Sequence, residues 1–189
     1  CSSDLTRLLR GQDRGYGCTK IRRGGGTLIF FRVGCLKKAL DGDNEIIETP
    51  LFPKSFPNFG GYRHKILLGL GSNIENPMRI LKKAVFFLLR DKKIAPLQSF
   101  YILKNPPFGY LEQPYFYNTA LLVQTNLAPK AFLRRTMWVE KRFGRKRSFK
   151  NAPRTLDIDI IFFENIVMYN NELSLPHPHW RQRGSVIVP

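Results

Sequence analysis

The feature that most constrains this chain is residues 156–163, which read Leu-Asp-Ile-Asp-Ile-Ile-Phe-Phe. Every second position is apolar, at Leu156, Ile158, Ile160 and Phe162. A period of two predicts a β-strand with Asp157 and Asp159 on one face, roughly 7 Å apart. Two carboxylates this close repel each other unless a positive group lies between them, and Arg154 or a divalent metal could supply it.

A basic segment precedes this predicted strand and contains Arg142, Arg145, Lys146, Arg147 and Lys150. Phosphate chemistry needs cations together with a metal held by carboxylates, and Mg²⁺ prefers such hard oxygen ligands. An exposed Asp-x-Asp strand and a solvated or nucleic-acid-binding basic run would contain the same residue types. Because Arg154 joins the basic segment to the two aspartates, we favour a phosphate site beside a metal site.

Composition narrows the class of protein. The chain has 189 residues, 43% of them hydrophobic, and a formal net charge of +17, which predicts a polyanionic ligand such as a nucleotide or a nucleic acid. No apolar run approaches the length of a membrane span, so we expect no membrane partner. The three cysteines form no Cys-x-x-Cys pair, which favours a reducing, cytoplasmic location.

The first 63 residues differ from the rest of the chain. Residues 20–26 are basic and glycine-rich, residues 27–33 could form one strand, and three prolines between residues 50 and 57 indicate an extended connector. No motif with chemistry occurs there. We therefore expect residues 1–63 to be an irregular extension without an assigned function that is dispensable for catalysis.

The pattern of apolar residues over 64–189 predicts one globular domain. Strands are expected at 65–70, 97–103, 115–125 and 156–163. Asn76 and Pro77 begin a helix after the first strand, and a second helix has Pro129 in its first turn and stops at Gly144. The order β-α-β-β-α-β predicts an α+β fold of the ferredoxin-like type, with an antiparallel sheet and both helices on one face.

Several motifs resemble those of the hydroxymethyl-dihydropterin pyrophosphokinases and occur in that family's order. They are Gly71-Ser72-Asn73, Ser99-Phe100-Tyr101, Pro106-Pro107-Phe108-Gly109, Gln113-Pro114 with Asn118, Ala152-Pro153-Arg154 leading into Asp157-Ile158-Asp159, Pro176-His177 and Arg183-Gly184. Together they cover about residues 65–189, so the resemblance rests on more than one pattern.

The resemblance implies that pyrophosphate passes from ATP to the hydroxymethyl group of 6-hydroxymethyl-7,8-dihydropterin, giving AMP and the pterin diphosphate in folate biosynthesis. It implies two Mg²⁺ ions at Asp157 and Asp159, and catalytic arginines at Arg145 and Arg154. The positions that match the family's ATP site are Glu140, Arg147, His177 and Arg183. The positions that match its pterin pocket are Asn105, Pro106, Phe108, Phe116 and Asn118.

The sequence also departs from the family. Ser185 stands where a second pterin-stacking aromatic residue is usual, and family members usually continue beyond the position of Pro189, so we expect a truncated C-terminus. An inactive truncated relative is therefore one alternative. A nucleic-acid-binding module with the same element order is another, although the expected strands lack its basic-Gly-aromatic-Gly-aromatic pattern. We expect a monomer that does not bind nucleic acid.

Overall fold

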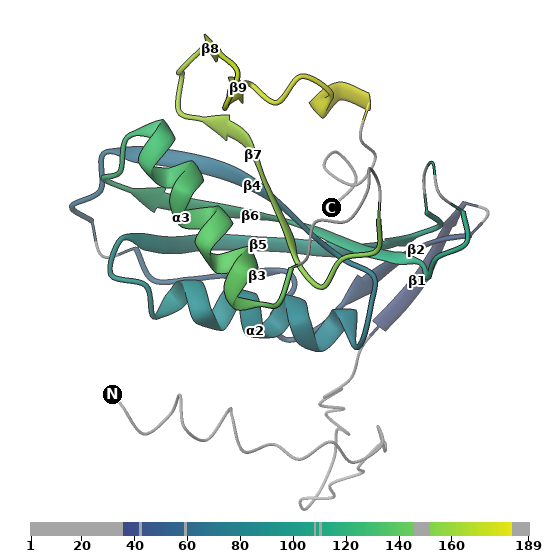
Figure 1. Cartoon of the computed structure of the whole chain (residues 1–189). Coiled ribbons are helices and arrows are strands. Elements are labelled where there is room, and N and C mark those ends of the chain that lie inside the picture. The colour runs from purple at the N-terminus through teal and green to yellow at the C-terminus, as the bar shows by residue number, and fades with distance from the viewer. Residues whose placement is uncertain are drawn as a thin grey trace, which may run out of the picture. The chain divides into compact units, whose positions relative to one another are not determined.

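The main body of the described part of the chain is a seven-stranded antiparallel sheet with two helices (Figure 1). The structure is a computed structural model and describes residues 36–41, 43–58, 60–107, 109, 111–145 and 152–182. Residues Cys35–Pro189 form one compact unit. The expected α+β class with an antiparallel sheet is confirmed.

Four strands of the sheet lie in the spatial order β5-β6-β4-β7, with β7 at the edge. They are β4 (His64–Ser72), β5 (Ile94–Asn105), β6 (Phe116–Thr125) and β7 (Asp157–Phe163). The helices are α2 (Pro77–Leu89), which follows β4, and α3 (Pro129–Arg142), which follows β6. The expected β-α-β-β-α-β order along residues 64–163 is therefore confirmed, with β4 and β5 longer than expected.

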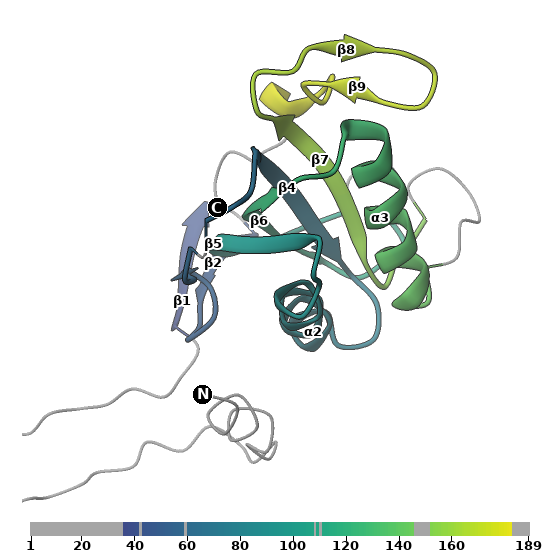
Figure 2. The ribbon, with the colours of Figure 1, turned by 90° about the vertical axis from the view of Figure 1, so that its left-hand side faces the viewer.

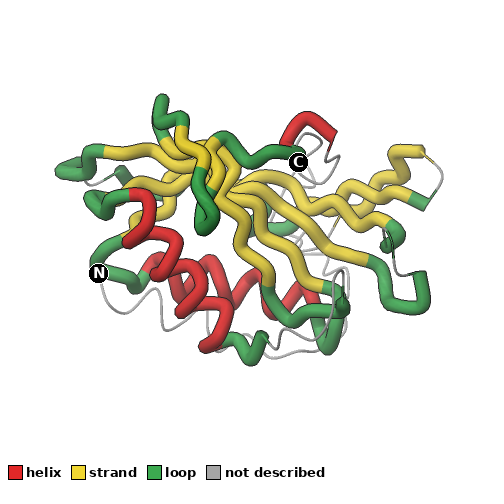
Figure 3. The backbone as a smooth tube through the Cα atoms, turned by 45° about the horizontal axis from the view of Figure 1, so that its top comes forward, coloured by secondary structure: helices red, strands yellow, loops and turns green. Residues whose placement is uncertain are grey.

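Both helices cover the same face of the sheet (Figures 2 and 3). The Asn76 side chain accepts a hydrogen bond from the backbone N–H of Arg79 at 3.0 Å, so α2 begins where the sequence predicts. The buried side of α2 consists of Ile80, Leu81, Ala84, Val85 and Leu88. These side chains pack on the alternate apolar positions of the strands, and the opposite face of the sheet, here called the open face, is left for other contacts.

Three strands precede this core and extend its sheet. They are β1 (Leu36–Asp41), β2 (Asn44–Glu48) and β3 (Lys54–Ser55). β1 pairs with β2, and both β2 and β3 pair with β5. The expectation of an irregular extension is therefore wrong for residues 36–55, and the strand expected at residues 27–33 lies outside the described residues.

These added strands also contribute to the hydrophobic core. Ile47 is 1% exposed and Phe52 is fully buried, and Leu51 joins the same cluster. The Ser99 hydroxyl on β5 donates a hydrogen bond to the Leu51 carbonyl at 2.5 Å. We therefore no longer expect this part of residues 1–63 to be dispensable.

Strand β7 contains an irregularity that the sequence pattern did not predict. Its pairing with β4 shifts register between Leu67 and Leu68, where Ile161 is the extra residue. Phe163, not Phe162, consequently enters the core, where the centre of its ring lies 5.7 Å from the centre of the Phe132 ring. An added residue reverses the faces of the positions that follow it, so strict alternation ends at Ile160.

After β7 the chain forms a small hairpin beside the edge of the sheet. Its strands are β8 (Met168–Tyr169) and β9 (Ser174–Leu175), and a 3₁₀ turn follows at Trp180–Gln182. The Trp180 ring packs against Phe162 at 4.9 Å, which ties this segment to β7. Neither α2 nor α3 is long and apolar enough to cross a membrane.

Candidate active site

One row of residues crosses the open face of the sheet. Gly71 in β4 lies opposite Asp157 in β7 on one side and opposite Asn118 in β6 on the other. Gly69 lies opposite Asp159 in the same way. Residues directly opposite each other in a sheet share a face, so the two aspartates and Asn118 stand on the open face with glycines between the strands that carry them.

Gly71 allows this arrangement because it has no side chain. A Cβ atom on Gly71 would lie 2.7 Å from Asn118 Oδ1 and 4.0 Å from Asp157 Cβ. The first distance is too short for a contact between a Cβ atom and an oxygen. The row therefore needs glycine at this position to keep Asn118 in place.

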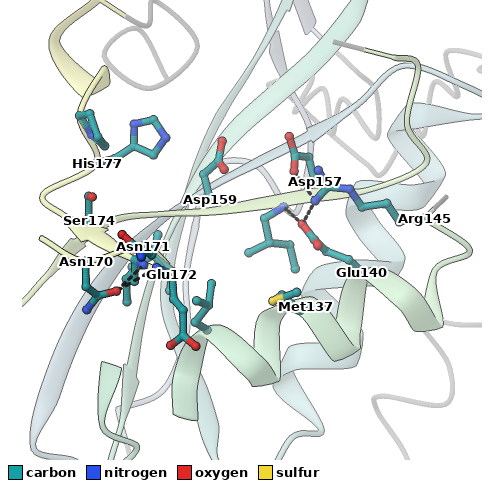
Figure 4. A pocket seen from close by; sticks show the side chains of 15 residues that line it. Met137, Glu140, Arg145, Asp157, Asp159, Asn170, Asn171, Glu172, Ser174 and His177 are labelled. Atoms are coloured by element: carbon teal, nitrogen blue, oxygen red, sulfur yellow. Dashed lines mark hydrogen bonds and ion pairs between the residues drawn. The ribbon is translucent and has the colours of Figure 1, made fainter. Parts of the chain in front are cut away.

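The Asp157 carboxylate is held by two arginines. Arg145 Nη1 lies 2.5 Å from Asp157 Oδ1, and Arg154 Nη1 pairs with the other oxygen. The three side chains are 15–21% exposed, so the charges are partly removed from water. The two arginines predicted to be catalytic thus converge on a predicted metal ligand, and Figure 4 shows Asp159 on the same side of β7 as Asp157.

Glu140 connects this cluster to the free edge of β7. Its carboxylate accepts a hydrogen bond from the Ile158 backbone N–H at 2.8 Å and pairs with Arg145. Burial raises the pKa of the Glu140 carboxyl to about 7 from its ordinary value of 4.5, and nearby Asp157 adds to the rise. The Ile158 N–H and the Arg145 guanidinium oppose this rise in pKa, but burial is the larger effect.

A pocket of about 320 Å³ opens beside this cluster, between α3, β7 and residues 170–178 (Figure 4). It brings together five of the predicted site residues, which are Glu140, Arg145, Asp157, Asp159 and His177. The His177 backbone N–H donates to the Ile161 carbonyl at 2.9 Å, and its Nδ1 accepts from the His179 N–H at 3.2 Å. These bonds orient the imidazole beside the pocket.

The apolar wall of this pocket has no signature in the sequence. Leu133 and Met137 from α3, Ile160 from β7 and Leu173 contribute to its lining. The Asn170 side chain accepts hydrogen bonds from the backbone N–H groups of Glu172 and Leu173 at 3.0 and 2.9 Å, which shapes the turn beside it. Apolar residues at helix and strand positions carry no sign of a ligand, because core residues follow the same pattern.

The predicted pterin residues form a second group next to the first. Asn118 Nδ2 donates to Asn105 Oδ1 at 2.8 Å, and Asn105 Nδ2 donates to the Pro106 carbonyl at the same distance. The Arg154 guanidinium lies 5.6 Å from the Phe116 ring centre. Arg154 therefore contacts both groups, while Phe108, Arg147 and Arg183 lie outside the described residues.

Asn73 is a further residue whose role the sequence did not reveal. It is 1% exposed, its Oδ1 accepts from the Arg154 N–H at 2.8 Å, and its own N–H donates to the Arg154 carbonyl at 3.2 Å. Its Nδ2 donates to Gln113 Oε1 at 2.8 Å and to the Pro114 carbonyl at 3.3 Å. Asn73 thus joins the end of β4 to the backbone of Arg154 and to the segment before β6. The motif Gly71-Ser72-Asn73 was the available signal.

The chemistry of the site fits Mg²⁺. Asp157 and Asp159 are half-buried oxygen donors on one face, and the glycines opposite them have no side chains to cover that face. Among the described residues, no group of three or more His, Cys, Asp or Glu side chains is arranged to hold a metal ion. Two carboxylates are the complement expected where Mg²⁺ also binds substrate phosphates.

Comparisons with known proteins identify the family. Residues 67–189 match the family described as 7,8-dihydro-6-hydroxymethylpterin-pyrophosphokinase. A Helicobacter pylori protein named 2-amino-4-hydroxy-6-hydroxymethyldihydropteridine pyrophosphokinase is 45% identical over 147 residues, which cover 77% of this chain and 90% of that protein. A Campylobacter jejuni protein of the same name is 36% identical over 150 residues, which cover 79% of this chain and 96% of that protein.

A more distant relative places a similar region inside a longer protein. The folic acid synthesis protein fol1 of Pneumocystis carinii is 31% identical over 66% of this chain but only 17% of its own length. These comparisons support the pyrophosphokinase interpretation and give no support to the nucleic-acid-binding alternative.

The Helicobacter match also bears on the N-terminal strands. A match over 77% of 189 residues spans about 146 of them, so it has to begin at residue 44 or earlier. Strands β2 and β3 therefore lie within the region shared with that relative. From the family match over residues 67–189 and from these relatives, the chain belongs to the 7,8-dihydro-6-hydroxymethylpterin-pyrophosphokinase family.

Proposed function

We infer that this chain transfers the β,γ-pyrophosphoryl group of ATP to the hydroxymethyl oxygen of 6-hydroxymethyl-7,8-dihydropterin, in folate biosynthesis. The bond to AMP breaks and the pterin diphosphate forms. The observation that carries this inference is that Arg154 lies between two groups of side chains. It pairs with Asp157 on one side and faces the Phe116 ring on the other.

We propose that the 320 Å³ pocket takes the adenosine end of ATP. Leu133, Met137, Ile160 and Leu173 offer apolar surface for a base, and polar backbone of residues 170–174 lies at its border. Glu140, His177 and Asp157 line the same pocket. The proposed ATP contacts of Arg147 and Arg183 stay predictions from the sequence.

Asp157 and Asp159 would hold Mg²⁺, and the family resemblance suggests two ions. When bound, the metal gathers the triphosphate and neutralises part of its charge. Because Arg145 and Arg154 pair with Asp157 in this structure, we propose that they turn toward the phosphates when metal takes over that carboxylate. Their guanidinium groups then offset negative charge on the transferring group, and no protein nucleophile is required.

The pterin is proposed to lie over the open face beside Asn118. Phe116 offers a ring for stacking, while Asn118 and Asn105 offer amide groups for the polar edge of the pterin, with Pro106 at the border. The proposed pterin contact of Phe108 stays a prediction from the sequence. The hydroxymethyl group would then point toward Arg154 and the phosphates. The row Asn118–Gly71–Asp157 supports this direction, because it runs from the recognition groups to the proposed metal ligands.

The finer description of the fold is also a proposal. The sheet order β5-β6-β4-β7 and the connections through α2 and α3 support a ferredoxin-like core. The expected monomeric state and cytoplasmic location stay predictions.

The direct test is AMP release by the full chain. With Mg²⁺, ATP and 6-hydroxymethyl-7,8-dihydropterin, we expect stoichiometric AMP and pterin diphosphate, and no AMP when the pterin is omitted. AMP release that does not depend on the pterin would contradict the assignment. A complete absence of AMP with a folded protein would favour the inactive relative.

A further inference from the structure

The N-terminal strand β2 lies at the base of the loop that joins β5 to β6, here called the pterin loop and defined as residues 106–115. β2 pairs with the last part of β5, and Glu45 lies directly opposite Lys104. Lys104 comes immediately before Asn105, one of the proposed pterin residues. The family match begins at residue 67 and so does not include β2. Strand β2 nevertheless lies against one end of the pterin loop.

Lys104 connects the two ends of this loop. Its Nζ atom lies 2.8 Å from Glu45 Oε1 and 5.0 Å from the centre of the Tyr115 ring. Tyr115 immediately precedes Phe116, another proposed pterin residue. One ammonium group thus contacts β2 on one side and the far end of the loop on the other.

The ion pair between Lys104 and Glu45 stabilises the charged form of each side chain. The hydrogen bond from Lys104 lowers the pKa of the Glu45 carboxyl below its ordinary value, and the same bond raises the pKa of Lys104. The two side chains are 31% and 23% exposed, so water and salt partly screen the pair. The pair is therefore formed at neutral pH and is of moderate strength.

We propose that Glu45 is a positioning residue for the pterin pocket, which fixes Lys104 so that Lys104 holds both ends of the pterin loop. This proposal rests on the proposed function, because it takes the loop to be part of the pterin site. We call Glu45, Lys104 and Tyr115 the stem clamp. None of its members needs to touch the substrate, since Asn105 and Phe116 are the next residues along the chain.

The physical reason is conformational entropy. A lysine side chain has several rotatable bonds, and its ion pair with Glu45 limits the positions from which Nζ can reach the Tyr115 ring. Strand pairing of Asn105 with Phe116 already holds the loop ends together. Without Glu45, the Tyr115 end loses a side-chain contact, so the pocket is formed for a smaller fraction of the time. The apparent affinity for the pterin falls by that fraction, whereas the ATP pocket between α3 and β7 is unaffected.

The test compares Glu45→Ala with Glu48→Ala in the full chain. Glu48 lies on the same strand, is exposed, and makes no ion pair within the described part of the chain, so it is a matched control. We expect Glu45→Ala to raise the KM for the pterin about 2- to 5-fold, as for other partly exposed ion pairs, with kcat and the KM for ATP unchanged. Glu48→Ala should leave all three constants as in the wild type.

Two further measurements isolate the clamp. Lys104→Met should raise the pterin KM by a similar factor, and the double variant should be no worse than either single one, because both changes remove one interaction. Amide hydrogen exchange in residues 111–115 should be faster in Glu45→Ala than in Glu48→Ala, in the absence of any substrate.

Equal pterin KM values for Glu45→Ala and Glu48→Ala, with equal exchange rates, would overturn the proposal while leaving the proposed function intact. Parallel losses for pterin and ATP would also overturn it, since a general loss of structure produces that result. A wild-type protein that releases no AMP would instead contradict the proposed function, and the exchange comparison would still decide whether the clamp exists.

Discussion

Gly71 and Asn118 face each other across β4 and β6 so closely that a Cβ atom on Gly71 would lie 2.7 Å from Asn118 Oδ1. Gly71→Ala should therefore push the Asn118 carboxamide out of its hydrogen bond with Asn105. We expect the KM for the pterin to rise at least 10-fold, with a smaller change in the KM for ATP. Steady-state kinetics with each substrate varied in turn would measure this. Unchanged pterin binding would show that Asn118 is not used for recognition.

Replacing Asn73 should affect both the transfer step and pterin binding, because Asn73 is hydrogen-bonded to the backbone of Arg154 and to the Gln113 side chain. Asn73→Ala leaves buried polar groups without partners and should lower stability by about 2–4 kcal/mol, measured by urea unfolding. It should also lower kcat and raise the pterin KM. Gln113→Ala removes one side-chain partner of Asn73 and leaves the bonds between Asn73 and Arg154, so it should raise the pterin KM and leave kcat near the wild-type value. Identical effects of the two changes would contradict this separation.

We expect two N-terminal deletions to differ sharply in stability and turnover, because only the longer one removes β1–β3. Removing Cys1–Gly34 leaves the compact unit Cys35–Pro189 intact, and turnover should stay within a few-fold of the full chain. Removing residues 1–63 takes Ile47, Leu51 and Phe52 out of the core, where each large-to-small loss costs about 2–5 kcal/mol. The shorter protein should fail to unfold cooperatively on heating. A stable, active protein lacking residues 1–63 would show that β1–β3 are dispensable after all.

The raised pKa of the Glu140 carboxyl should make the stability of the metal-free protein depend on pH. Its pKa is about 7 in the folded state against an ordinary 4.5, so the folded protein holds this proton more tightly than the unfolded chain does. The resulting stability is fully present below about pH 4.5 and is lost as the pH rises through 7. Relative to Glu140→Gln, the free energy of unfolding should therefore fall by on the order of 1–3 kcal/mol between pH 5 and pH 8. Parallel curves for the two proteins in urea titrations would contradict the shift.

The strand that carries Asp157 and Asp159 and the start of α2 could be predicted from the sequence for clear physical reasons. Alternation placed both aspartates on one face, and Asn76 followed by Pro77 marked the first turn of α2. The pattern failed at Ile161, because an added residue in one strand leaves no local sign in the sequence. The alternation therefore grouped Phe162, and not Phe163, with Ile158 and Ile160.

The added strands could not be predicted because they depend on pairing with β5. β2 is five residues long and carries two adjacent isoleucines, of which Ile47 enters the core and Ile46 lies on the other face. Such a segment has no clear period of its own. Likewise, Asn73 becomes a link only when Arg154 and Gln113, which are 81 and 40 residues away in sequence, are brought to it by the fold.

The central claim is that Asp157 and Asp159 hold the metal that gathers the triphosphate, and AMP release at saturating Mg²⁺ tests it most directly. Asp159→Ala is the sharper variant, because Asp157 also pairs with Arg145 and Arg154. Each substitution should lower the rate of AMP release by about 100-fold or more, since misplaced phosphates alone cost that much. Asp43→Ala, at an exposed aspartate in the turn between β1 and β2, should keep the wild-type rate. Retained AMP release in both Asp157→Ala and Asp159→Ala would contradict the metal assignment and the mechanism built on it.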